Sequence, residues 1–203
     1  MGVLRSFDLS LYEAECFVET GTQKGVGLDY ALQHDYKELH SIEINEEYYN
    51  FCTQKYKFVD KVKLYHGDSE TRIDDVLLAI EKFDSCFFWL DAHLPTDPGS
   101  QMKKEYTCSS DKIEFPLEVE LQAIKEGRPA KDDIILIDDL RIYLDGPFQY
   151  PGHTWPHRAK YPDFFPHKDG IKFIEEMFED THSFHKIYNH EGYLLLLPKS
   201  RAE

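Results

Sequence analysis

The chain has 203 residues, of which 41% are hydrophobic, which is enough for one compact domain and too little for two full ones. We therefore expect a single domain over residues 1–203. The formal net charge of −15 repels polyanions, so nucleic acid is excluded as the expected partner. No segment is apolar over the length of a membrane span, and the four cysteines lack Cys-x-x-Cys spacing. These features predict a cytoplasmic protein.

The first predicted strand leads into a turn that is rich in glycine. Residues 16–20 read Cys-Phe-Val-Glu-Thr, and Gly21, Gly25 and Gly27 follow. Glycine lets the backbone approach a ligand closely, and the N-terminus of the following helix would face that ligand. Such turns occur in many loops, so the glycines alone are weak evidence. Together with Glu19 at the strand end, they predict a cofactor site.

The following segments repeat one pattern, in which an apolar strand ends in an acid and a helix comes next. Acids stand at the ends of the next four predicted strands: Glu43, Asp68, Asp91 and the pair Asp138–Asp139. These strands are expected over 39–44, 62–66, 87–90 and 133–139, with helices over 26–34, 46–56, 70–82, 115–126 and 169–179. Successive acids of this kind describe the carboxyl edge of an open α/β sheet, where such folds bind ligands.

The last predicted elements are a pair of strands, over 185–189 and 193–197, joined by a turn that contains Gly192. They are typical of an antiparallel hairpin. Residues 94–114 and 145–167 show no sustained period and are expected to be irregular, the second stretch being rich in aromatic side chains.

This order of elements resembles the class I S-adenosylmethionine-dependent methyltransferases over nearly the whole chain. The resemblance implies an α/β fold, Rossmann-like and doubly wound, with a mostly parallel seven-stranded sheet and a C-terminal antiparallel hairpin. It also implies S-adenosylmethionine as the cofactor. The residues that would bind this cofactor are Glu19, Gly21, Thr22, Gly25, Glu43, Gly67, Asp68, Ser69 and Asp91.

Physical reasons support two of these assignments. A carboxylate such as Glu43 can accept two hydrogen bonds from a ribose diol, and Asp68 can accept one from the adenine amino group. Each acid could instead cap a helix or be a solvated charge. A dinucleotide-binding dehydrogenase is the alternative with the same fold, but its Gly-x-Gly-x-x-Gly spacing is absent after Gly21.

Carboxylates at neighbouring strand ends also predict a metal site. Asp91, Asp138 and Asp139 offer the oxygen ligands that Mg²⁺ or Mn²⁺ prefers, and a metal there would lower the pKa of an acceptor hydroxyl. His93 would be the general base, with Asp91 as the second catalytic residue. His93 could instead bind the metal or orient Asp91, and Asp138 or Asp139 could cap a helix or pair with Arg141.

The metal set resembles that of metal-dependent sugar O-methyltransferases, although the base of that family lies three residues beyond the first ligand and His93 lies two beyond Asp91. The chain also resembles small methyltransferases of glycan pathways, including those that methylate rhamnose on the capsid glycans of large algal viruses. This resemblance implies a sugar hydroxyl as acceptor, with Tyr150, His153 and Trp155 lining its groove.

Other interpretations remain open at this stage. The aromatic rings of 148–165 could instead form a lid or a homodimer contact. The acceptor could be a catechol-like small molecule rather than an oligosaccharide. A catalytically inactive glycan-binding module of the same fold is the alternative from another class.

Overall fold

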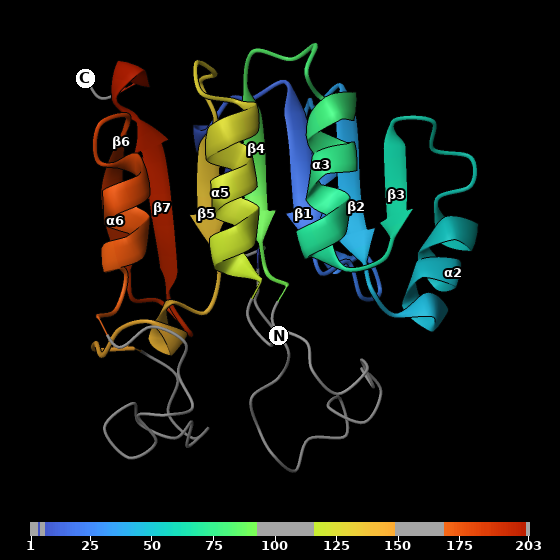
Figure 1. Cartoon of the computed structure of the whole chain (residues 1–203). Helices are drawn as coiled ribbons and strands as arrows, with labels where there is room; N and C mark the ends of the chain where they lie inside the picture. The colour runs from blue at the N-terminus through green and yellow to red at the C-terminus, as the bar shows by residue number, and fades with distance from the viewer. Residues whose placement is uncertain (1–3, 5–6, 93–115, 149–168, 202–203) are drawn as a thin grey trace.

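A seven-stranded sheet organises the chain (Figure 1). The computed structural model describes residue 4 and residues 7–92, 116–148 and 169–201. The strand order is β3-β2-β1-β4-β5-β7-β6. The strands are β1 (Cys16–Thr20), β2 (Glu38–Glu43), β3 (Val62–His66), β4 (Cys86–Leu90), β5 (Ile134–Ile137), β6 (His182–Ile187) and β7 (Tyr193–Pro198).

The sheet is parallel from β3 to β5, and β7 joins it in the antiparallel direction between β5 and β6. This arrangement confirms the Rossmann-like sheet and its C-terminal antiparallel hairpin. The strands β1 and β4, which are separated by three helical connections in the sequence, are direct neighbours. The strand order therefore reverses between them, which is where folds of this type bind ligands.

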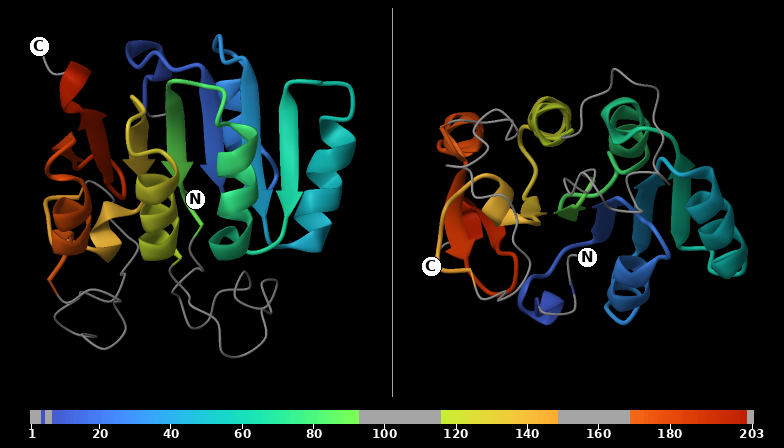
Figure 2. Two further views of the ribbon diagram at one scale, coloured as in Figure 1. Left: turned by 45° about the horizontal axis from the view of Figure 1, so that its top comes forward. Right: turned by 90° about the horizontal axis from the view of Figure 1, so that it is seen from below.

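Helices cover both faces of the sheet (Figure 2). One face carries α3, α5 and α6, and the other carries α1 and α2, as the two separate buried clusters also indicate. The helices are α1 (Val26–Ala31), α2 (Glu46–Lys55), α3 (Ser69–Ala79), α5 (Leu117–Gly127) and α6 (Lys172–Phe178). Short 3-10 turns are η2 (Leu9–Leu11), η3 (Leu140–Ile142) and η4 (Lys199–Arg201). Among the described helices, none has the length and apolarity needed to cross a membrane.

Burial follows the position of each strand in the sheet. All residues of β1, β4 and β5 are buried, as strands covered on both faces must be, whereas no residue of the edge strand β3 is fully buried. Burial is also incomplete on α2, which packs against this edge strand. Cys52 and Tyr56 are buried, but Tyr48 and Tyr49 are half-buried. The ring of Tyr49 stacks on His66, with 5.0 Å between ring centroids.

Candidate cofactor site

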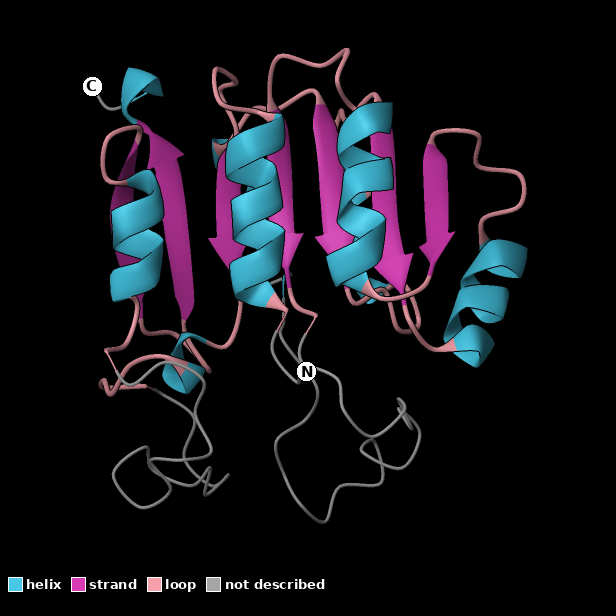
Figure 3. Cartoon of the chain, in the orientation of Figure 1, coloured by secondary structure: helices cyan, strands magenta, loops and turns pink. Residues whose placement is uncertain are grey.

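The turns after β1 to β4 meet at one edge of the sheet, the edge to which the parallel arrows point in Figure 3. Backbone hydrogen bonds join these turns in pairs. Gly21 N donates to Ile42 O (3.0 Å), Gly67 N donates to Glu43 O (2.9 Å), and Asp91 N donates to Thr20 O (3.2 Å). The sequence expectation that these strand ends lie side by side is confirmed.

A cavity of about 210 Å³ opens at the ends of β1 and β4. Its lining residues include Glu19, Gly21, Thr22 and Asp91, all of which the sequence assigns to the cofactor. The remaining assigned residues do not line this cavity; they are Gly25, Glu43, Gly67, Asp68 and Ser69. Residues that the sequence did not assign also line it, among them Gln23, Gly27 and Trp89.

Two glycines shape this cavity. The φ of Gly21 is +88°, in the left-handed region, and a Cβ there would lie 2.8 Å from the carbonyl oxygen of Asp91. A Cβ on Gly27 would overlap the Glu19 carboxyl oxygen Oε1. A side chain at either position would therefore displace an acid that lines the cavity, which explains why glycine stands at both.

Glu19 lies in a buried network of hydroxyl groups. Its side chain is 2% exposed, and its Oε2 accepts a hydrogen bond from Ser41 Oγ at 2.6 Å. The hydroxyls of Ser41 and Thr22 are 2.5 Å apart, and Thr22 also donates to Ile42 O. Burial raises the pKa of Glu19 to about 8. The hydrogen bond from Ser41 favours the ionised form and lowers this pKa, but its effect is smaller than that of burial. Glu19 is therefore mostly protonated at neutral pH.

Glu43 fixes the turn that follows β1. Its Oε2 accepts from Gln23 N at 2.6 Å, and its Oε1 accepts from Asn45 N at 2.7 Å. Burial raises the pKa of this carboxyl although both backbone hydrogen bonds favour its ionised form. Each carboxylate oxygen has a second lone pair, so the expected contact with ribose hydroxyls remains chemically available and stays a prediction.

Asp68 caps a helix, which is the alternative to cofactor binding that the sequence left open. It is the N-cap of α3, and its Oδ1 accepts from Glu70 N at 3.2 Å. The neighbouring Ser69 is buried, and its side chain hydrogen-bonds Glu120 on α5. The structure therefore gives both residues partners within the chain. Their contact with adenine stays a prediction.

The predicted metal ligands follow β4 and β5. Burial raises the pKa of Asp91 well above its usual range, and the nearby carboxyl groups of Asp139 and Glu19 add to this effect. Asp138 Oδ1 accepts from Asp139 N at 2.7 Å. Asp139 pairs with Arg141, 3.1 Å from Oδ1 to Nε, so the pairing that was the alternative to metal binding is confirmed.

These carboxylates do not form a metal-binding set in the part of the chain that the structure describes, where no group of three His, Cys, Asp or Glu side chains is placed to hold an ion. The guanidinium of Arg141 supplies positive charge to Asp139 instead, and it also reaches Glu191 Oε1 at 2.6 Å. Metal binding by Asp91, Asp138 and Asp139 therefore stays a prediction. The base expected beside them, His93, lies outside the described residues, as do Tyr150, His153 and Trp155.

Sequence reasoning missed two acids at this edge of the sheet. Glu191 lies in the turn between β6 and β7, and its pKa is raised by burial and by its hydrogen bond to Asp139. Glu120 lies on α5 and is 1% exposed. It occupies a position of the apolar stripe formed by Leu117, Leu121 and Ile124. An acid inside such a stripe was the signal that could have identified Glu120.

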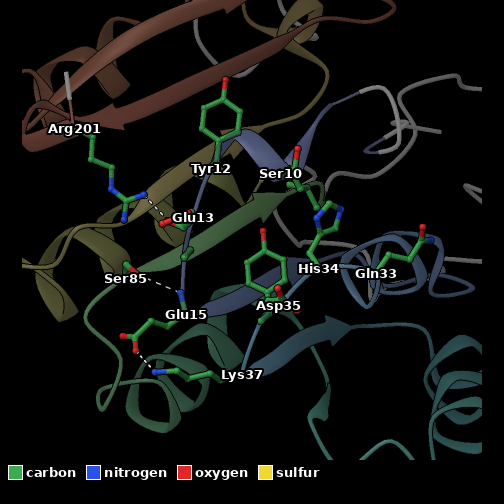
Figure 4. Close-up of a pocket in the computed structure, with 13 residues that line it drawn as sticks. Ser10, Tyr12, Glu13, Glu15, Gln33, His34, Asp35, Lys37, Ser85 and Arg201 are labelled. Carbon is green, nitrogen blue, oxygen red and sulfur yellow. Dashed lines mark hydrogen bonds and ion pairs between the residues drawn. The ribbon is translucent and has the colours of Figure 1, made fainter. Parts of the chain in front are cut away.

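A larger hollow of about 780 Å³ lies near the opposite, amino ends of the strands (Figure 4). Some of its charged side chains pair with neighbouring groups: Lys37 pairs with Glu15, and Arg201 donates to the carbonyl oxygen of Glu13. Ser85 Oγ accepts from Glu15 N at 3.3 Å. None of the residues that the sequence assigns to the cofactor lines this hollow.

Comparisons with known proteins bear on the fold. No protein-family model and no curated protein matches the sequence. Among solved structures, the chain is similar to the SAH-bound methyltransferase PaMTH1 of Podospora anserina, with a TM-score of 0.60, 19% identity, and coverage of 95% of this chain and 75% of that chain.

Two further solved structures are similar. An O-methyltransferase from Bacillus cereus in complex with SAH has a TM-score of 0.51 and 11% identity, over 94% of this chain and 77% of that one. The methyltransferase domain of bacterial CtHen1-C has a TM-score of 0.53 and 9% identity, over 94% and 92%. The seven-stranded sheet with its reversed C-terminal hairpin is thus the Rossmann-like fold of these methyltransferases.

Proposed function

We propose that the chain is an S-adenosylmethionine-dependent O-methyltransferase that acts on a sugar hydroxyl. The observation that carries this proposal is the cavity at the ends of β1 and β4, lined by Glu19, Gly21, Thr22 and Asp91, in a sheet with the methyltransferase strand order. Two of the similar structures hold SAH, the form that S-adenosylmethionine takes after it gives up its methyl group.

The bound cofactor would supply an electrophilic methyl group on a sulfonium. Transfer is an in-line displacement, so the protein has to orient both partners and take the proton of the acceptor hydroxyl. Gly21 admits the cofactor, and Glu43 holds the backbone of Gln23 at the cavity wall. His93 remains the general base predicted from the sequence, and Asp91, whose backbone N–H donates to Thr20 O, remains the second catalytic residue.

The acidic groups at this edge of the sheet favour an acceptor with neighbouring hydroxyl groups. Asp91 and Asp139 influence each other's ionisation at this edge, and Glu191 bonds to Asp139. Carboxylates accept hydrogen bonds from diols, which a sugar such as rhamnose and a catechol both offer. The sugar is our first choice, and the catechol-like acceptor is the second. Transfer of a labelled methyl group to a panel of both compounds separates them.

Metal assistance is a separate part of the proposal, and no step above passes through a metal. Transfer that survives a chelator would contradict the metal part of the proposal and leave Arg141 as the positive charge beside Asp139. Loss of transfer in the chelator, restored by Mg²⁺ or Mn²⁺, would support the metal predicted for Asp91, Asp138 and Asp139.

A calorimetric titration of S-adenosylmethionine tests the cofactor. We expect saturable binding, weakened by Glu43→Ala roughly tenfold or more, because Gln23 N and Asn45 N each lose a charged acceptor. Glu47→Ala is the matched control, since Glu47 is exposed on the first turn of α2. Absence of binding, or binding of NAD in its place, would contradict the proposed function.

A further inference from the structure

We propose that Glu120 is a positioning residue of the cofactor site, whose buried side chain holds the turn after β3 against the end of β1. The link between the turns is a property of the chain itself. Its effect on the cofactor rests on the proposed function.

Glu120 reaches this position from the first turn of α5. Its carboxyl group hydrogen-bonds the side chains of Ser69 and Thr20. Ser69 is the first residue of α3 and directly follows the predicted adenine contact Asp68, and Thr20 is the last residue of β1. One carboxyl group therefore joins two turns that come from opposite sides of β2 in the sheet.

The link continues to the end of β4. Thr20 Oγ1, which bonds Glu120, also accepts from the backbone N–H of Asp91 at 3.3 Å. Asp91 lines the cavity next to Gly21, so a shift of Thr20 would move the cavity wall. Glu120 is buried and does not line the cavity, and the proposed function assigns it no role.

The surroundings of Glu120 favour its protonated form. Burial raises the pKa of Glu120 to about 7, although the hydrogen bonds from Ser69 and Thr20 favour the ionised form. The charges of Asp68 and Glu70 on α3 raise it further, and Tyr143, after η3, also lies within its electrostatic reach.

Ionisation of Glu120 would be costly in this environment. Its Oε1 has no hydrogen-bond partner among the residues that the structure describes, so a negative charge there would be poorly compensated. The folded arrangement around Glu120 is therefore most stable while this residue carries its proton, because burial of the charge outweighs the two hydrogen bonds, and it loses stability as the pH rises through about 7.

The variant Glu120→Gln tests this inference, because it keeps an acceptor oxygen of the same reach and cannot ionise. Without cofactor, we expect the melting temperature of the wild type to fall by several degrees relative to the variant between about pH 6 and about pH 8. Glu118→Gln, an exposed position on the same helix, should follow the wild type. Parallel curves for the wild type and Glu120→Gln would overturn the inference.

Cofactor titrations at the same pH values test the positioning role. We expect the dissociation constant for S-adenosylmethionine to rise roughly threefold or more with pH in the wild type relative to Glu120→Gln. Glu120→Ala, which removes both bonds, should bind weakly at every pH, with Glu120→Gln restoring affinity. Equal pH dependence of binding in the wild type and Glu120→Gln would refute the positioning role. If no cofactor binds at any pH, the proposed function fails, while the melting curves still decide whether Glu120 links the turns.

Discussion

Glu19 is a protonated acid in the wall of a cavity proposed to receive a cationic cofactor. A positive charge next to a buried carboxyl group lowers the pKa of that group. The pKa of Glu19, which burial raises to about 8 in the ligand-free chain, would therefore fall below neutrality when the cofactor binds. We therefore predict that S-adenosylmethionine binding releases about one proton per site at about pH 7. Titrations in buffers of different ionisation enthalpy measure this release directly.

Glu19→Gln is the matched control for this prediction, since it keeps the hydrogen bond from Ser41 and has no proton to lose. The release should disappear in this variant while binding persists with lower affinity. Proton release of the same size in Glu19→Gln would mean that another group, such as Asp91, titrates on binding.

At the level of single residues, the sequence predicted the part of the site that depends on strand ends. Glu19, Gly21, Thr22 and Asp91 line the cavity because each stands at or just after the carboxyl end of a parallel strand. Glu120 was missed because its role depends on how a helix far along the chain packs against the turns. The spacing marks Glu120 as an acid within an apolar stripe, but it does not show which turns that side chain reaches.

At the level of elements, Arg128 joins α5 to α3 and β5. Its guanidinium donates to both oxygens of Asp133, at 2.5 and 2.7 Å, and to the carbonyl oxygens of Ile80 and Phe83. Both side chains of the ion pair are almost fully buried. We predict that Arg128→Met lowers the free energy of unfolding by about 3–5 kcal/mol, because Asp133 is left as an uncompensated buried charge.

Urea denaturation measures this loss. The exposed pair of Lys131 and Asp84 provides a control nearby, and Lys131→Ala should cost about 0–1 kcal/mol. A similar cost for both variants would mean that the buried pair contributes no more than a surface contact.

Element types were predicted well and element ends less well. The apolar strands follow from local chemistry, and α2 begins at Glu46 as expected. By contrast, α3 begins at Ser69 rather than at residue 70, and ends at Ala79 rather than at 82. Its start is set by Asp68, and the backbone beyond Ile80 turns toward the guanidinium of Arg128. A helix end fixed by a tertiary contact cannot be predicted from periodicity.

At the level of the whole molecule, buried acids determine how stability should depend on pH. Burial raises the pKa values of Glu19 and Glu120 to about 8 and about 7, and those of Asp91 and Glu43 are also raised. Between the unfolded pKa near 4.5 and these values, the folded state binds more protons than the unfolded state. We predict that the melting temperature of the ligand-free chain falls as the pH rises from about 5.5 to about 8.5.

Salt distinguishes the titration of buried acids from repulsion between surface charges as the cause of this fall in melting temperature. The formal net charge of −15 would also destabilise the chain at high pH, but surface repulsion is screened at about 0.5 M salt and buried sites are screened much less. The fall in melting temperature should therefore persist in salt. A curve that becomes flat in salt would assign the effect to the surface.

The placement of β7 between β5 and β6 has a consequence for synthesis on the ribosome. Ile135 pairs with Leu196, so one edge of β5 stays unpaired until residues about sixty positions later have been synthesised. Until then, the nascent sheet presents the unpaired backbone edge of a wholly apolar strand. The emerging chain would be prone to aggregation during this interval, and a ribosome-associated chaperone would have its greatest effect there.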